Sequence, residues 1–498
     1  MRIFMLGWEF PPFVAGGLGT ACAGITKALH KQGHEITFVL PKSVDGATSP
    51  HVDLIGPEAL RASVDQLRKI TVELRETEVP VADVPGVPVV RPRTPGAAPV
   101  DPARPTPPAD APAHPGQPLA SVYPAFDDDR FREALASVTR SGSGRAGGSL
   151  ESLLGIGSLA GINTGSATQL TRVLTEIVES LDHGPSGETQ YGGDLFGDAQ
   201  RYARLVCGLG IQRSFDVIHA HDWLTFPAAL ALKALTGKPL VCHVHATEFD
   251  RSGEHVNQGV YDIERAGVLG ADRVVAVSRL TKSILISRYG ADENTVDVVY
   301  NGVEQDEAQP PRGKRIESTD KIVLFLGRIT MQKGPEYFIN AAKRVLEKVE
   351  NVKFVVAGSG DMAVKMIDQA AALGIGHKVL FTGFLRGRDV DRVFGLADCY
   401  VMPSVSEPFG IAPLEAMRND TPVIVSKQSG VSEVLTHALK VDFWDVDEIA
   451  NLIVAVLKYP PLSQTLREHG AFELRGITWD GAAEKYVKVY GRAIGSAG

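Results

Sequence analysis

Cysteine is scarce in this sequence. Its 498 residues include only four cysteines, which lie far apart at Cys22, Cys207, Cys242 and Cys399. No two of them have the C-x-x-C spacing of a redox motif or a thiolate zinc site. The sequence therefore argues against a disulfide framework and favours a reducing compartment.

Long apolar runs and excess positive charge are also lacking. The N-terminal stretch MRIFMLGWEFPP reaches glutamate and proline too early for a signal peptide, and no apolar run approaches the ~18 residues that span a bilayer. The net charge of −8 argues against nucleic acid as a partner. We therefore expect a cytoplasmic protein with no membrane span.

The rest of the composition is that of an ordinary globular chain, and the length favours two or three domains. Short apolar runs alternate with helix-length segments, which is typical of buried parallel strands between layers of helices. The runs that we interpret as strands are Arg2–Leu6, Glu35–Leu40, Phe215–Ala220, Leu240–Val244, Arg273–Val277, Val296–Tyr300, Ile322–Leu326, Val352–Ala357, Val379–Phe381, Cys399–Met402 and Val423–Val425.

These strands form two series, separated by a polar segment at Glu304–Asp320. We therefore predict an α/β protein with two doubly wound domains, at residues 1–305 and 306–478. Residues 479–498 contain an amphipathic helix, with Tyr486, Val487 and Tyr490 on one side.

One segment interrupts the first series. Pro80–Pro118 holds 13 of the 31 prolines, and Ser141–Gly148 is rich in serine and glycine. We interpret residues of about 80–150 as an insertion without regular structure, either a linker or surface arm or a proline-rich docking site.

The segment SEPFGIAPLEA places two carboxylates, Glu407 and Glu415, around an irregular turn. Gly410 permits an unusual backbone angle, and Pro413 suits the first turn of a helix that begins near Ile411. The free N–H groups of such a helix bind phosphate oxygens well, which leaves the carboxylates for hydroxyl groups. A capped, solvated helix start is the alternative.

Two cations follow the strand at Ile322–Leu326, in the sequence GRITMQKG. Arg328 can bind phosphate through two hydrogen bonds, and Lys333 adds a mobile charge. Both lie at the carboxyl end of a strand, where open α/β sheets bind ligands. Isolated loop cations are usually solvated, but beside a helix N-terminus they are complementary to a diphosphate.

Glycines and histidines give two weaker signals. The sequence AGGLG, with Gly16 and Gly17, either lets the backbone approach a ligand or forms a plain tight turn. HAHDW and HVHATEFDRSG put alternate histidines on one face of a strand. These are core histidines, a polar pocket at strand ends or a metal cluster, and metal is disfavoured because no acidic residues have a recognisable ligand spacing.

Together these motifs resemble the retaining nucleotide-sugar glycosyltransferases of GT-B architecture, and most closely the glycogen synthase-like enzymes of bacteria and archaea. The resemblance rests on WEFPPFVAGGLG, HAHDW, HATEFDRSGE, AVSR, NGVE, LGRITMQKG, SEPFGIAPLEA and TWDGAAEKY. It covers nearly the whole chain except the proline-rich insertion and its flanks. The family's KTGGL is VAGGL here, so its lysine is absent.

The resemblance implies two Rossmann-like domains that face each other across a cleft, with the C-terminal helix returning to the first domain. It also implies a role for each site residue. Catalytic roles fall to His245 near the anomeric carbon, Glu407 at the transferred sugar and Asp222 near the sugar or the acceptor. Substrate-binding roles fall to Gly16, Gly17, Arg328, Lys333, Phe409, Gly410, Ile411 and Glu415.

The implied reaction needs no cofactor and no divalent metal, because fixed cations stabilise the departing diphosphate. The implied partners are a nucleotide-sugar donor and a carbohydrate acceptor. Our first hypothesis is transfer of glucose from ADP-glucose or UDP-glucose to the non-reducing end of an α-1,4-glucan. The alternatives are synthesis of a disaccharide or cell-envelope glycan, and a catalytically silent nucleotide-sugar binder.

Overall fold

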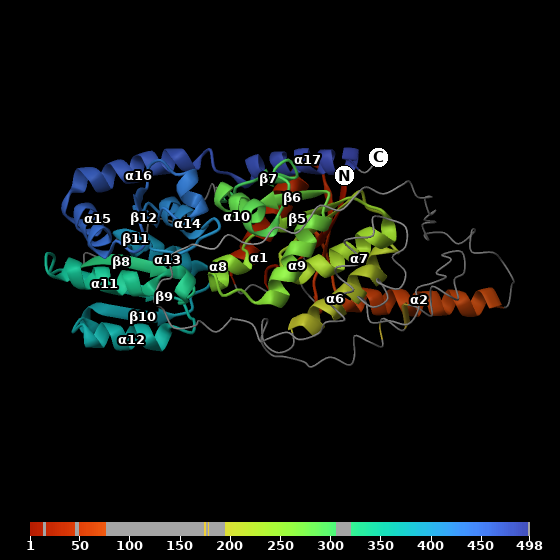
Figure 1. Ribbon diagram of the computed structural model, residues 1–498, viewed down its shortest axis with the longest axis horizontal. Helices are drawn as coiled ribbons and strands as arrows, with labels where there is room; N and C mark the ends of the chain where they lie inside the picture. The colour runs from red at the N-terminus through yellow and green to blue at the C-terminus, as the bar shows by residue number, and fades with distance from the viewer. Residues whose placement is uncertain are drawn as a thin grey trace.

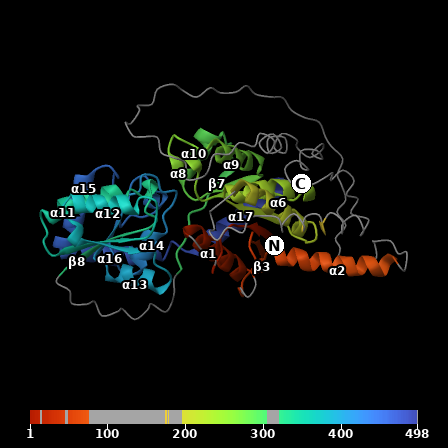
Figure 2. The ribbon, with the colours of Figure 1, turned by 90° about the horizontal axis from the view of Figure 1, so that it is seen from below.

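The computed structural model describes residues 1–12, 16–44, 49–75, 174–175, 178, 195–304 and 320–496. Two lobes lie side by side in both views (Figures 1 and 2), and each is built on one parallel sheet. The insertion expected at about 80–150 lies outside the described residues, as does the boundary expected at 305–306.

The first domain has, among its described residues, a seven-stranded sheet in the order β3-β2-β1-β4-β5-β6-β7. Every neighbouring pair is parallel. The strands are β1 (Arg2–Leu6), β2 (Glu35–Val39), β3 (Asp53–Ile55), β4 (Val217–His221), β5 (Leu240–Val244), β6 (Arg273–Ala276) and β7 (Val296–Val298).

Helices cover both faces of this sheet. They are α1 (Gly17–Lys31), α2 (Pro57–Arg75), α6 (Leu195–Gly210), η2 (Trp223–Thr225), α7 (Phe226–Thr236), α8 (Glu248–Ser252), α9 (Gln258–Gly270) and α10 (Arg279–Tyr289). Because neighbouring strand residues point to opposite faces, Phe4 and Leu6 pack with α2, α6, α7 and α9. Ile3 and Met5 pack on the other face with α1 and the last helix of the chain, α17 (Trp479–Ser496).

The second domain has a six-stranded parallel sheet in the order β10-β9-β8-β11-β12-β13, again among the described residues. The strands are β8 (Lys321–Leu326), β9 (Val352–Ala357), β10 (Val379–Gly383), β11 (Cys399–Met402), β12 (Val423–Ser426) and β13 (Leu439–Val441).

This sheet is also covered on both faces. Its helices are η3 (Met331–Lys333), α11 (Pro335–Leu346), α12 (Ala363–Ala372), η4 (Gly376–Lys378), α13 (Arg388–Leu396), α14 (Ala412–Arg418), η5 (Gly430–Glu433), α15 (Val446–Lys458) and α16 (Pro460–Leu474). Val323 and Phe325 of β8 pack with α11, α12 and α15, whereas Leu324 packs with α13 and α14. Two covered parallel sheets confirm the α/β fold class predicted from the sequence.

The chain crosses between the domains twice. After β7 it runs into the second domain, and before α17 it returns, with Val303 and Thr478 forming a parallel bridge at the crossing. A Cβ atom on Gly302 would lie 2.3 Å from the carbonyl carbon of Thr478, so only glycine fits there. The helix α17 then lies against α1, β4, β5 and β6 of the first domain (Figures 1 and 2). The predicted return of the C-terminal helix is therefore confirmed.

The helix α17 completes the first domain's core. Tyr486 and Tyr490 are fully buried, and Val487 is partly buried against the same cluster, as predicted. The indole ring of Trp479 packs directly on Gly24 of α1. A Cβ atom on Gly24 would lie 2.3 Å from this ring. No helix among the described residues combines the length and the apolar character that a bilayer span requires.

We predict that Trp479→Ala destabilises the first domain, because Trp479 is 6% exposed and its indole fills the space beside Gly24. A buried tryptophan truncated to alanine costs about 3–5 kcal/mol of unfolding free energy. Urea unfolding followed by circular dichroism measures the loss. Trp444→Ala is the matched control, since Trp444 is 56% exposed and should change little. Equal losses in the two variants would contradict this packing role.

Candidate active site

The SEPFG turn follows β11 directly and leads into α14. Gly410 has a φ of 97°, so the unusual backbone angle expected there is present. Pro413 lies in the first turn of α14, and no side chain caps this helix. The N–H of Val431 donates to the Phe409 carbonyl, which ties the turn to the neighbouring loop. The sequence therefore builds a fixed turn with an uncapped helix start.

Glu407 and Lys333 lie together although they are 74 residues apart. The lysine Nζ is 2.5 Å from Oε2 of the glutamate, and the Ser404 hydroxyl donates to the same oxygen at 3.2 Å. Glu407 is buried and Lys333 is partly buried. The ammonium of Lys333 and the carboxylate of Glu407, from the two loops predicted to bind the donor, are therefore in direct contact.

Arg328 has a different environment from Lys333. It is exposed in the loop after β8, and among the described residues it has no ion-pair partner. Its guanidinium is therefore available to an incoming anion at the carboxyl end of β8.

Glu415 lies in the first turn of α14, as predicted, and is partly buried. Burial raises its pKa, although Arg418 has the opposite effect. A carboxyl group in this setting gains from a hydroxyl donor that replaces the water it has lost.

Asp222 and His245 form the polar part of the first domain's site. Oδ1 of Asp222 accepts the backbone N–H of His245 at 2.7 Å. Asp222 follows β4 and has a φ of 60°, a left-handed conformation that a residue other than glycine adopts only where its surroundings hold it. Burial raises the pKa of the Asp222 carboxyl to about 7, although its bonds to backbone N–H groups lower it.

The four histidines of the two strand ends form one group, which we call the histidine stack: His219, His221, His243 and His245. Burial lowers the pKa of His219 and of His245 to about 3 and that of the other two well below the ordinary value. Neighbouring rings lie close together with their planes inclined, at a centroid distance of 4.3 Å and an angle of 27° for His219 and His221, and 3.9 Å and 32° for His243 and His245.

This stacking bears on the metal alternative. Ring nitrogens of His219, His221 and His243 lie within 4.8 Å of one another. However, both nitrogens of His219 already have hydrogen-bond partners, Tyr490 and His243. Because His219 uses both ring nitrogens in these hydrogen bonds, the arrangement favours a hydrogen-bonded polar core.

Gly16 and Gly17 begin helix α1 at the carboxyl end of β1. A Cβ atom on either glycine would meet nothing within 4 Å, so the space in front of the helix is open. The N–H of Gly16 donates to Oε2 of Glu9 at 3.2 Å, and Glu9 is buried. The carboxylate thus fixes the start of the helix.

A hydrogen bond joins the two halves of the candidate site. The Ser406 hydroxyl of the SEPFG turn donates to Oδ1 of Asp250 at 2.5 Å. Asp250 caps α8, the short helix that follows His245. The helix α8 also lies beside η3, which carries Lys333. The loop with His245 therefore meets the loops with Lys333 and Glu407 at one junction between the domains.

A second contact supports this junction. Both carboxylate oxygens of Glu433 accept N–H groups at the start of α10, from Arg279 at 2.9 Å and Leu280 at 2.8 Å. The adjacent Gly430 is so close to the first domain that a Cβ atom would lie 2.5 Å from Cβ of Ser278. Close backbone approach explains why glycine occupies this position.

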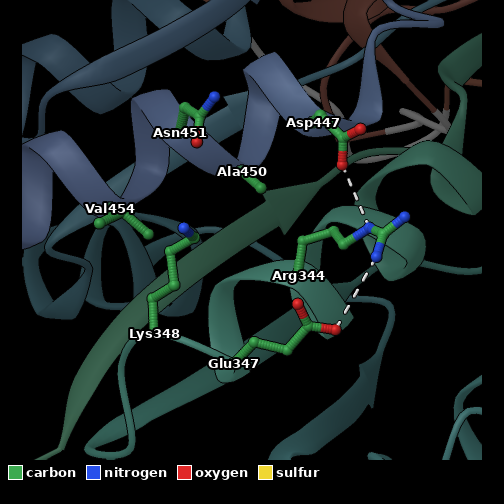
Figure 3. Close-up of a pocket in the computed structure, with 7 residues that line it drawn as sticks. All are labelled: Arg344, Glu347, Lys348, Asp447, Ala450, Asn451 and Val454. Atoms are coloured by element: carbon green, nitrogen blue, oxygen red, sulfur yellow. Dashed lines mark ion pairs between the residues drawn. The ribbon is translucent and has the colours of Figure 1, made fainter.

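A charged hollow elsewhere in the second domain lies between α11 and α15 (Figure 3). Its Arg344 pairs with Asp447 at 3.1 Å and with Glu347 at 3.9 Å. Arg344 lies ~14 Å along α11 from Pro335, given 1.5 Å per helical residue. None of the predicted site residues lines the hollow, so we do not assign it to the active site.

Sequence reasoning missed Glu9, Asp250 and Ser406 as parts of the site. Each belongs to a motif that the sequence displays, WEFPP, HATEFDRSGE or SEPFG. Membership of such a motif was the only available signal, because the contact between Asp250 and Ser406 joins residues 156 positions apart.

Comparison with known proteins gives consistent matches along the chain. Residues 2–95 match the starch synthase catalytic domain, residues 194–307 match glycosyltransferase family 4, and residues 306–471 match glycosyl transferases group 1.

Curated relatives include two named glycosyltransferases and a glycogen synthase. An uncharacterized glycosyltransferase of Methanocaldococcus jannaschii is 34% identical over 300 residues, which cover 57% of this chain and 76% of that protein. A D-inositol 3-phosphate glycosyltransferase of Salinispora arenicola is 28% identical over 57% of this chain and 70% of its own. A glycogen synthase of Mycobacterium tuberculosis is 29% identical over 61% of this chain and 77% of its own.

The fold has solved counterparts. The sucrose-phosphate synthase of Thermosynechococcus elongatus superposes with a TM-score of 0.63 over 99% of both chains at 15% sequence identity. That similarity supports the GT-B arrangement of two parallel-sheet domains expected from the sequence. Sequence matches along both domains and a relative more than 30% identical over three quarters of its length lead to one conclusion. The chain belongs to the group 1 glycosyltransferases.

Proposed function

We propose that this glycosyltransferase moves glucose from ADP-glucose or UDP-glucose to the non-reducing end of an α-1,4-glucan, with retention of the anomeric configuration. The observation that carries the proposal is the junction at Ser406 and Asp250, which joins the loops of His245 and Glu407. The match of residues 2–95 to starch synthase and the similarity to a glycogen synthase support a glucan product.

The donor diphosphate would lie between the two domains. Arg328 and Lys333 would bind its oxygens, together with the open helix start at Phe409, Gly410 and Ile411. Glu415 would accept the ribose hydroxyls. Gly16 and Gly17 would approach the phosphates from the first domain, since among the described residues no atom lies within 4 Å of a Cβ placed on either glycine.

The transferred sugar would lie against the first domain. Glu407, held by Lys333 and Ser404, would contact the sugar and stabilise positive charge on it. His245 would lie near the anomeric carbon, and Asp222 would accept a hydroxyl of the sugar or the acceptor.

In the proposed reaction, the bond between the anomeric carbon and the β-phosphate oxygen breaks, and the diphosphate keeps the electron pair. The acceptor oxygen then bonds to the same face of that carbon and gives its proton to the departing phosphate. Fixed cations that face the developing negative charge supply the main electrostatic stabilisation. We infer that Arg328 and Lys333 make a divalent metal unnecessary.

A second candidate function is transfer to a small phosphorylated or cell-envelope acceptor. The similarity to a D-inositol 3-phosphate glycosyltransferase, at 28% identity, favours it. The proposed donor contacts serve either reaction, because they recognise diphosphate, ribose and sugar only.

A donor and acceptor panel separates these functions. We expect transfer from ADP-glucose or UDP-glucose to glycogen or a maltooligosaccharide, with an α-1,4 linkage by product analysis. Transfer only to an inositol phosphate or another small acceptor would support the second candidate. Absence of transfer from every glucose nucleotide would remove the first.

We predict that Arg328→Ala weakens binding of ADP or UDP by about 10- to 100-fold, since a hydrogen bond to a charged group contributes ~1.5–3 kcal/mol. Isothermal titration calorimetry measures the Kd. The matched control is Arg344→Ala in the charged hollow (Figure 3), which should leave the Kd unchanged. Equal losses in the two variants, or no loss in Arg328→Ala, would contradict the assignment.

We also predict that kcat/KM rises as the pH increases through about 7, the pKa of Asp222. Only the ionised carboxylate accepts a substrate hydroxyl with full strength. Asp222→Asn should abolish this step in the pH profile and lower the rate at pH 8. A variant that keeps the step would show that another group causes it.

Stability supplies the control for Asp222→Asn. The pKa of Asp222 in the folded protein lies above the ordinary value of 3.8, so the wild-type unfolding free energy should fall as the pH rises from about 4 to about 7. The unfolding free energy of Asp222→Asn should fall less over the same range. Burial also raises the pKa of Glu264 to about 7, and Glu264 in turn raises the pKa of Asp222, so the difference between the two proteins reports this coupled pair of carboxyl groups.

A further inference from the structure

The histidine stack lies on the face of the first sheet that α17 covers. His219 and His221 come from β4, His243 is the last but one residue of β5, and His245 follows this strand. Three of the rings are fully buried, and His245 is partly exposed. His245 is thus the member of the stack that a substrate can reach.

Two members of the stack are bound to α17. The hydroxyl of Tyr490 is 2.7 Å from Nδ1 of His219, and the hydroxyl of Tyr486 is 3.4 Å from Nε2 of His243. His219 and His243 are linked to each other at 3.3 Å. This series of hydrogen bonds uses both ring nitrogens of His219 and of His243, and it does not include His221 or His245.

His221 has one partner, and that partner is His245. Nδ1 of His221 is 2.9 Å from Nε2 of His245. Nε2 of His221 is buried and, among the described residues, has no hydrogen-bond partner. The His221 ring lies beside the rings of His219 and Phe38, with centroids 4.3 Å and 6.3 Å away. The hydrogen-bonded pair therefore ends at His221.

The unpaired nitrogen restricts which ring donates the proton. Burial keeps both rings neutral, because it lowers both pKa values, so each ring carries a single N–H. If Nε2 of His245 donated to Nδ1 of His221, the single proton of His221 would be on its Nε2, as a buried N–H without a partner. If Nδ1 of His221 donates to Nε2 of His245, Nε2 of His221 has only a lone pair without a partner.

A buried N–H without an acceptor is the rarer defect in folded proteins. The second arrangement is therefore favoured, and it has a consequence for His245. With Nε2 accepting from His221, the only proton of the His245 ring must be on Nδ1.

We propose that His221 is a positioning residue, whose Nδ1–H bond to His245 fixes the tautomer in which His245 carries its proton on Nδ1. His245 then offers a neutral hydrogen-bond donor to an oxygen of the transferred sugar. Its backbone is held as well, by the bond from its N–H to Asp222. The role in turnover rests on the function proposed above, whereas the tautomer itself does not.

Nuclear magnetic resonance tests the tautomer directly. Long-range ¹H–¹⁵N correlation spectra of protein labelled with ¹⁵N-histidine distinguish a protonated from an unprotonated ring nitrogen. His245→Gln assigns the His245 signals by their loss from among the 13 histidines. We expect His245 in the Nδ1–H form in the wild type. An Nε2–H form would overturn the proposal.

Two substitutions at position 221 separate hydrogen bonding from packing. In His221→Asn the carboxamide nitrogen takes the place of Nδ1, so His245 should keep the Nδ1–H form. In His221→Leu the donor is lost, and the Nε2–H form should appear. Tyr486→Phe is the control, because it removes a hydroxyl bound to the stack at His243 only. An unchanged tautomer in His221→Leu, or the same change in Tyr486→Phe, would overturn the proposal.

Turnover provides the functional readout. We expect His221→Leu to lower kcat by about 100- to 1000-fold, the order of effect of losing one transition-state donor, with KM for the donor changed by less than about threefold. His221→Asn should restore most of kcat. Equal turnover in His221→Leu and wild type would overturn the positioning role. If no nucleotide sugar is turned over at all, the proposed function fails while the spectra still decide the tautomer.

Discussion

Parallel strand pairing is the constraint on which the site depends. Because all strands of a sheet run the same way, their carboxyl ends lie along one edge. In the first domain this edge carries the glycine turn after β1, Asp222 after β4 and His245 after β5. In the second it carries Arg328 after β8 and the SEPFG turn after β11. Residues that are hundreds of positions apart meet because the two edges are joined at Asp250 and Ser406.

Charge burial at this junction is balanced locally. A buried carboxylate is costly unless it is paired or accepts several hydrogen bonds. Glu407 has Lys333 and Ser404, whereas among the described residues Asp222 accepts hydrogen bonds only from backbone N–H groups and has a raised pKa. The second domain therefore holds an ion pair, and the first holds a carboxyl group whose pKa burial raises to about 7. Arg328 is the exposed cation at the same edge.

The sequence predicted most of the fold because buried parallel strands are continuous apolar runs. Arg2–Leu6, Leu240–Val244, Val352–Ala357 and Cys399–Met402 have the predicted bounds. The strands β3 and β13 were missed, since each has three residues and is not part of a longer apolar run. The strand β7 is equally short, but it was predicted because it begins the mostly apolar run VDVVY.

The site was less accessible to sequence reasoning than the fold. Motif resemblance selected the residues, but it gave no contact between them. The pairing of Lys333 with Glu407 and the histidine stack both depend on strand register and on where a loop returns. The apolar pattern of a single strand specifies neither its register with other strands nor the path of the loop that follows. The roles assigned from resemblance remain proposals, whereas the two-domain α/β architecture is confirmed.

The position of α17 has a consequence for how the protein is made. The ribosome delivers the strands and helices of the first domain early, but it delivers the helix that covers Ile3, Met5 and Val217 only after the whole second domain. Domains usually fold during synthesis in the order in which they emerge. Here the nascent first domain has α1 on this face of its sheet but lacks α17 until the second domain has been synthesised. During that interval, Ile3, Met5 and Val217 lack the contacts that Tyr486 and Tyr490 later supply.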